Sequence, residues 1–127
     1  MERYLIDSNA VIDYLNGRLP VSGMNFLNVV VDDLVMVSVI TKIETLGFKT
    51  TPEDELLTND FMDIALVIDL NDSIVNQTIA IRKMHKIKTP DAIIAATALN
   101  LDLTLISRNK SDFDKIPNLK LINPYEI

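Results

Sequence analysis

Residues 4–12 read YLIDSNAVI, a short apolar run that changes abruptly to three polar residues before a second apolar run. The first part predicts a buried β-strand over about residues 3–6, and residues 8–16 predict a helix that ends before Gly17. Asp7 falls between these two elements. Because ligands of open α/β folds bind beyond the carboxyl ends of the strands, Asp7 is a candidate site residue as well as a candidate helix-start residue.

The rest of the chain repeats this alternation of short apolar runs and helical patterns. Further strands are expected at residues 35–38, 66–68, 103–106 and 119–122. Helices are expected at about residues 25–32, 39–46, 52–64, 72–85 and from residue 89, with a loop at 18–24. Short β-branched runs that alternate with helices are typical of a parallel sheet with helices on both faces, so the predicted fold class is α/β.

Length and composition restrict the class of protein. A chain of 127 residues with 48% hydrophobic residues and only three glycines predicts one compact domain over residues 1–127. The absence of cysteine excludes disulfides, zinc–thiolate sites and thiol catalysis. There is no signal-peptide pattern, and no apolar run approaches the roughly 20 residues that span a bilayer. We therefore expect a soluble, cytoplasmic protein with no membrane association.

Four acidic residues lie near the ends or starts of predicted elements: Asp7, Glu44, Asp91 and Asp112. Taken singly, each has a structural explanation, since an acid also favours a turn, a solvated helix face or a first helical turn. Taken together, carboxylates that converge would need a counter-ion, because two unit charges about 4 Å apart repel by ~4 kcal/mol at an effective dielectric of 20. Hard oxygen ligands suit Mg²⁺ or Mn²⁺.

Three other features have more ordinary explanations. Asp13, on the first helix, is expected at the surface, and His85, the single histidine, is expected to be exposed at a helix end. Ser8 and Asn9 are expected to shape the turn after the first strand rather than to supply a nucleophile, because no histidine base accompanies them.

The charge is unevenly distributed. The net charge is −6, which alone argues against nucleic-acid binding, but residues 69–127 carry 8 basic and 7 acidic residues. A basic cluster of Arg82, Lys83, Lys86 and Lys88 precedes the helix that carries Asp91. This cluster is either a solvated helix end, where cations favour the helix dipole, or a contact surface for phosphates.

Four segments, in order, resemble the motifs of the PIN-domain nucleases, especially the VapC-type toxins of bacterial toxin–antitoxin pairs. These are residues 4–12 (YLIDSNAVI), 37–47 (VSVITKIETLG), 88–98 (KTPDAIIAATA) and 105–113 (LISRNKSDF). The third is the most specific, and the fourth has Ser107 where threonine is commoner in the family. The resemblance extends over essentially the whole chain.

The resemblance implies a three-layer α/β/α fold around a central, mostly parallel five-stranded sheet, and a metal-dependent endoribonuclease. It implies that Asp7, Glu44, Asp91 and Asp112 hold Mg²⁺ or Mn²⁺. It also implies a possible antitoxin partner and a homodimer. Residues expected to support the site or to touch substrate are Ser8, Asn9, Ser107 and Asn109, and those expected to contact RNA are Arg82, Lys83, Lys86, Lys88, Arg108 and Lys110.

Two other functions fit part of the sequence. A phosphoacceptor receiver domain shares the size, the acidity, the sheet type and the Mg²⁺ requirement, and Asp69, after the third strand, would be its acceptor. The missing pair of adjacent acids after the first strand counts against it. The second alternative is a catalytically silent module with a nuclease-like fold that binds RNA or a protein.

Overall fold

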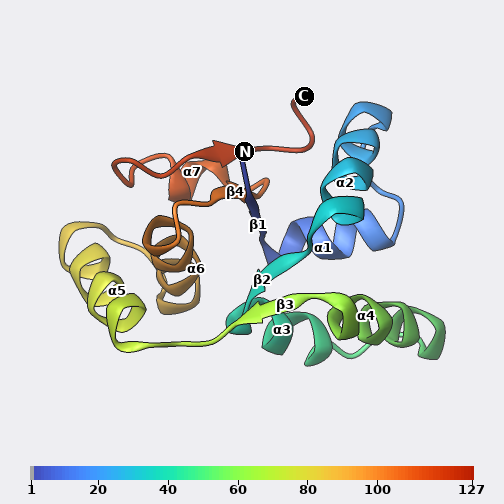
Figure 1. The fold of residues 1–127 in the computed structure, drawn as a ribbon, viewed down its shortest axis with the longest axis horizontal. Coiled ribbons are helices and arrows are strands. Elements are labelled where there is room, and N and C mark those ends of the chain that lie inside the picture. The colour runs from blue at the N-terminus through green and yellow to red at the C-terminus, as the bar shows by residue number, and fades with distance from the viewer. Residues whose placement is uncertain (1) are drawn as a thin grey trace.

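The computed structural model describes residues 2–127, in which five short strands alternate with seven helices (Figure 1). In chain order these are β1 (Tyr4–Ile6), α1 (Ser8–Leu15), α2 (Val21–Asp33), β2 (Met36–Ser38), α3 (Val39–Leu46), α4 (Pro52–Ile64), β3 (Leu66–Ile68), α5 (Asp72–Met84), α6 (Thr89–Asn100), β4 (Thr104–Ile106), α7 (Lys110–Phe113) and β5 (Leu121–Ile122). None of the helices in this described part has the length and apolar character that crossing a bilayer requires.

All strand pairings are parallel, as the sequence predicts. Strand β4 pairs with β1 on one side and with β5 on the other, and β2 pairs with β3. Strand β1 lies beside β2, but within residues 2–127 no ladder of hydrogen bonds joins them, so the five predicted strands form a three-stranded and a two-stranded group. The α/β fold is confirmed, with this break at its centre.

Alternating side chains on the strands create two cores. Leu5 and Leu105 are register partners and pack with α5 and α6, whereas the next pair, Ile6 and Ile106, packs with α1, α2 and α4. This division follows from the period of two along a β-strand. Figure 1 shows α5 and α6 to the left of the strands and α1, α2 and α4 to the right, which gives the predicted three layers.

Residues that end a strand also begin the next helix. Asp7 follows β1 and accepts a hydrogen bond from the backbone N–H of Ser8, and Ser38 ends β2 and accepts from Ile40 at 3.1 Å. A side-chain oxygen at this position satisfies a backbone N–H that the helix leaves free. The direct strand-to-helix connections therefore fix where Asp7 lies relative to the sheet.

Two elements differ from the sequence prediction. Helix α2 begins at Val21 rather than near residue 25, so the predicted loop at 18–24 is largely helical. Position 23 of this helix is occupied by glycine, and any larger residue would clash, because a Cβ there would meet the carbonyl oxygen of Pro124 at 2.1 Å. The second difference is the short helix α7, which is not among the helices that the sequence predicts.

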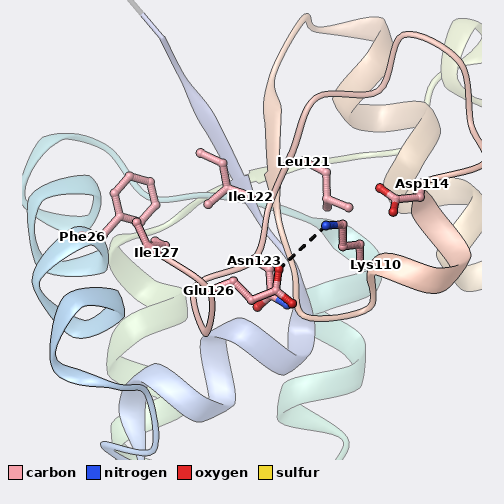
Figure 2. A pocket seen from close by; sticks show the side chains of 8 residues that line it. All are labelled: Phe26, Lys110, Asp114, Leu121, Ile122, Asn123, Glu126 and Ile127. Carbon is pink, nitrogen blue, oxygen red and sulfur yellow. Dashed lines mark ion pairs between the residues drawn. The ribbon is translucent and has the colours of Figure 1, made fainter.

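The C-terminal segment after β5 folds back onto α2. Ser22 Oγ donates to the carbonyl of Ile127 at 2.7 Å, and Phe26 and Ile127 line a cleft of about 300 Å³ with β5 (Figure 2). Lys110 and Glu126 form an exposed ion pair of 3.8 Å across the same cleft. The close approach at Gly23 thus belongs to a docked terminal segment.

The substitution Gly23→Ala tests this contact. Alanine improves helix propensity by about 1 kcal/mol, but its Cβ would collide with the Pro124 carbonyl. We expect a net loss of about 1–3 kcal/mol in the free energy of unfolding, measured by urea denaturation, as for other overpacked positions. Asn25→Ala, at an exposed position of the same helix, is the matched control and should be neutral or slightly stabilising. A Gly23→Ala variant more stable than the wild type would contradict the contact.

Candidate active site

A polar cleft of about 330 Å³ opens beyond the carboxyl end of β1, where the sequence predicts the site. Three of the four candidate carboxylates, Asp7, Glu44 and Asp91, line it together with Ser8, Asn9, Ile12, Asp13, Arg18, Arg108 and Asn109. The fourth, Asp112, lines an adjoining cleft and is joined to the first by a hydrogen bond from Asn109 Nδ2 to Asp112 Oδ2 at 3.0 Å.

Asp7 is the most buried of these acids, with 4% of its surface exposed. Its Oδ1 accepts from the Ser8 backbone N–H at 2.8 Å, and its Oδ2 accepts from Ser107 Oγ at 2.7 Å and from Asn9 Nδ2 at 3.0 Å. Ser107 directly follows β4, the strand that pairs with β1, so the parallel register brings it to Asp7. Three donors hold one carboxylate in a fixed orientation.

The negative charges of the four acids act on one another. Burial raises the pKa of Asp7 to about 6, against the hydrogen bonds from Ser107 and Ser8, and the charges of Asp91 and Glu44 add to the rise. Burial also raises the pKa of Asp91, followed by the charges of Asp112 and Glu44, with Lys88 acting in the opposite direction. Each of the four predicted carboxylates therefore takes part in at least one repulsive pair.

The two more exposed acids are also held by polar neighbours. Ser8 Oγ donates to Glu44 Oε1 at 2.6 Å and lies 3.2 Å from Thr41 Oγ1. Asn109, which holds Asp112, accepts no cap bond but donates its backbone N–H to Ser107 Oγ at 3.0 Å. The four polar residues predicted to support the site, Ser8, Asn9, Ser107 and Asn109, each hydrogen bond to one of its carboxylates.

The donor chemistry of the cleft fits a hard divalent cation. Carboxylates match the oxygen ligands that Mg²⁺ and Mn²⁺ prefer, and a cation would offset both the burial and the mutual repulsion that raise the pKa of Asp7 and Asp91. Within residues 2–127 no three Asp, Glu or His side chains lie close enough together to bind one metal ion without some movement. The four acids therefore border two adjoining clefts and do not form a closed set of metal ligands.

Asp13, which was expected at the surface, is buried, so that expectation is wrong. It is 3% exposed, and its Oδ2 accepts from Arg108 Nη1 at 3.0 Å and from the Tyr125 hydroxyl at 2.8 Å. The hydrogen bond to Asp13 is the main reason that the pKa of Tyr125 is raised. Asp13 therefore positions Arg108 at the wall of the cleft. No sequence pattern indicates this, because Tyr125 lies 112 residues away.

The basic residues predicted to contact RNA lie in four places. Arg82, Lys86 and Lys88 line the cleft that contains Asp112, and the structure adds Lys115, which the sequence analysis missed. Arg108 lines the carboxylate cleft, joined there by Arg18, also missed. Lys110 pairs with Glu126 in the cleft of Figure 2, and Lys83 is exposed on α5 outside the cleft that contains Asp112.

Comparisons with known proteins agree with this architecture. The PIN domain family model matches residues 4–119. A chain of a toxin–antitoxin complex from Klebsiella pneumoniae has 31% sequence identity and a TM-score of 0.76, covering 98% of this chain and 99% of that chain. A chain of the DNA-bound VapBC complex from Salmonella typhimurium is 21% identical with a TM-score of 0.83, covering 98% and 99%. One of VapBC2 from Rickettsia felis, bound to a promoter DNA fragment, is 22% identical with a TM-score of 0.78, covering 94% and 97%. No curated protein sequence gives a significant match.

The fold and the cleft thus define a compact α/β protein with an acidic site at the ends of its parallel strands, and the chain belongs to the PIN domain family. The membership of the PIN domain family that the four motifs predicted is confirmed by the family model, and the chains from the toxin–antitoxin complexes share its fold.

The raised pKa of Asp7 gives a pH-dependent stability. A carboxyl whose pKa rises from 3.8 to about 6 on folding stabilises the fold fully below pH 3.8, and this contribution is lost as the pH rises through about 6. At pH 7.5 without metal the loss is about 3 kcal/mol. The substitution Asp7→Asn avoids this loss of stability because the amide has no charge to bury. It also removes one hydrogen bond, which costs about 1 kcal/mol.

We therefore expect Asp7→Asn to be about 1–2 kcal/mol more stable than the wild type in urea at pH 7.5 with EDTA, and no more stable at pH 4. Asp69→Asn, at an exposed position after β3, should change neither value. An equal effect of Asp7→Asn at both pH values would show that burial of the charge is not the cause.

Proposed function

We propose that this protein is a metal-dependent endoribonuclease that hydrolyses RNA phosphodiester bonds and acts as the toxin of a toxin–antitoxin pair. The observation that carries the proposal is the gathering of Asp7, Glu44, Asp91 and Asp112, which come from four separate motifs and repel one another through space. A structural role explains one buried acid at a time, but it does not explain why four are kept together when none has an ion-pair partner among the described residues.

In this proposal the four carboxylates hold Mg²⁺ or Mn²⁺, which when bound polarises a phosphate oxygen and makes water a stronger nucleophile at neutral pH. The protein orients these ligands in advance. Ser107 and Asn9 fix Asp7, Ser8 fixes Glu44, and Asn109 fixes Asp112. Such supporting hydrogen bonds restrict the ligands to the orientations that binding requires.

Asp91 has a further role in the proposed reaction. Burial raises the pKa of Asp91 in the metal-free protein, and a bound cation would lower it again, so the proposed part of Asp91 in proton transfer rests on its position in the cleft. As the oxygen of water forms a bond to phosphorus, the bond from phosphorus to the leaving ribose oxygen breaks, and a carboxylate oxygen of the site takes the proton of the water. Asp91 is half-buried and borders the open cleft, so a substrate phosphate can reach it.

An antitoxin partner is part of the proposal. It is supported by the 31% identical chain, which comes from a toxin–antitoxin complex and matches along nearly its whole length. A homodimer remains a prediction from the resemblance. The receiver-domain alternative is disfavoured, because the chain belongs to the PIN domain family and Asp69 is exposed outside the carboxylate cleft.

Removing one ligand tests the proposal. Asp7→Asn and Asp91→Asn should each reduce Mn²⁺- or Mg²⁺-dependent cleavage of single-stranded RNA by at least about 100-fold, because the neutral amide is a poor ligand and a poor proton acceptor. EDTA should abolish the wild-type activity. In the same samples, Mn²⁺ should raise the melting temperature of the wild type but not that of Asp7→Asn.

The control is Asp69→Asn, which should cleave like the wild type. Full activity in either purified site variant would contradict the assignment of the carboxylates. Wild-type protein that binds RNA but does not cleave it with either metal would favour the catalytically silent module.

A further inference from the structure

A second cleft, of about 440 Å³, adjoins the carboxylates and is basic rather than acidic. Its charged lining consists of Arg82, Lys86, Lys88 and Lys115, with Asp112 at the side that faces the carboxylates. The two clefts meet at the Asn109–Asp112 hydrogen bond, since Asn109 lines the first and Asp112 the second. We name this second space, defined by its four cationic residues, the basic cleft.

The sequence from His85 to Lys88 explains how two of these cations reach the cleft. The backbone is extended at His85 (φ −138°, ψ 148°) and at Lys88 (φ −67°, ψ 147°), so successive side chains point in opposite directions. Ile87 is buried in the core beside α5 and α6, and its neighbours Lys86 and Lys88 are exposed. The buried Ile87 side chain thus fixes the backbone so that Lys86 and Lys88 on either side of it are exposed.

The other two cations hold this segment in place. Arg82, in the last turn of α5, donates its Nε–H to the carbonyl of Ile87 at 3.4 Å, and Lys115 donates its Nζ to the carbonyl of Lys86. Lys115 lies between the buried residues Phe113 and Ile116, which fix the backbone there. The stretch from Arg82 to Lys88 and the segment that carries Asp112 and Lys115 therefore converge on this cleft.

The cations of the basic cleft lack protein counter-ions. Within the described residues none of the four lies within 4.0 Å of a carboxylate oxygen. Five cations elsewhere in the described residues also lack such a partner, so the distinguishing feature is that these four share one cleft. Four like charges kept together and unpaired are best explained by an external anion.

We propose that the basic cleft binds the phosphates of the RNA strand next to the bond that is cleaved, so that the strand passes over the segment between α5 and α6 before it reaches the carboxylates. This inference rests on the proposed function. It assigns a role to Lys115 and excludes Lys83. Phosphate contacts position the strand without reading its sequence, so the basic cleft supplies affinity and alignment rather than base specificity.

The test is the salt dependence of RNA binding. A short fluorescein-labelled single-stranded RNA is titrated in EDTA, which prevents cleavage, at a series of KCl concentrations, and binding is followed by anisotropy. Each phosphate contact that is lost should reduce the slope of log K against log [salt] by about 0.7 for a single strand. We expect this reduction, with several-fold weaker binding, for Lys86→Gln and for Lys115→Gln, which keeps a donor for the Lys86 carbonyl.

Two variants serve as controls. Lys83→Gln removes a charge one residue away from Arg82 but outside the basic cleft, and it should leave the slope unchanged. Lys115→Arg keeps the charge and should restore the wild-type slope. Circular dichroism of each variant verifies that the fold is retained.

The outcomes separate this inference from the proposed function. Equal slopes for Lys83→Gln and Lys115→Gln, in a protein that cleaves RNA with Mn²⁺, would overturn the basic cleft and leave the nuclease intact. The expected slopes in a protein that never cleaves RNA would support the cleft and contradict the nuclease. A glutamate-rich peptide whose binding is weakened by Lys115→Gln, while RNA binding is not, would overturn the proposal in favour of a protein partner.

Discussion

The site depends on keeping one carboxylate, Asp7, almost entirely out of water. The backbone N–H of Asp7 donates to the carbonyl of Ile106 at 2.9 Å, so the pairing of β1 with β4 extends to the residue that carries the acid. The same register places Ser107 beside it, and the start of α1 supplies the other donors. A slip of one residue between these strands would turn the side chains to the opposite faces and separate Asp7 from Ser107.

This arrangement works against stability without metal. A buried carboxylate with two acidic neighbours has a raised pKa, and near neutral pH the protein must tolerate its ionisation. The surrounding hydrogen bonds reduce this cost but do not remove it. The uncharged cores on the two faces of the strands, which contain residues such as Leu5 and Ile6, compensate for it. The preorganised site therefore lowers the stability of the metal-free fold, as functional sites commonly do.

The sequence predicted what depends on local pattern. The five strands, the position of Asp7 at a strand end and the four motifs with their supporting polar residues all follow from short segments. It did not predict what depends on contacts between distant residues. Asp13 was expected at the surface because its partner Tyr125 lies far away in the sequence, in the terminal segment. The predicted start of helix α2 was too late because glycine, here Gly23, disfavours a helix. Lys115 has no motif, and only the fold brings it to Lys86.

The distribution of charge explains how an acidic protein could still attract an anionic strand. At physiological ionic strength the field of an exposed charge is screened over about 8 Å, so nearby groups outweigh the net charge. The three acids in the first turn of α4, Glu53, Asp54 and Glu55, lie on the opposite side of the strands from α5 and α6 (Figure 1). A phosphate that approaches the segment between α5 and α6 therefore meets unpaired cations first. The carboxylates lie beyond them, where a bound cation would be needed to make the next step favourable.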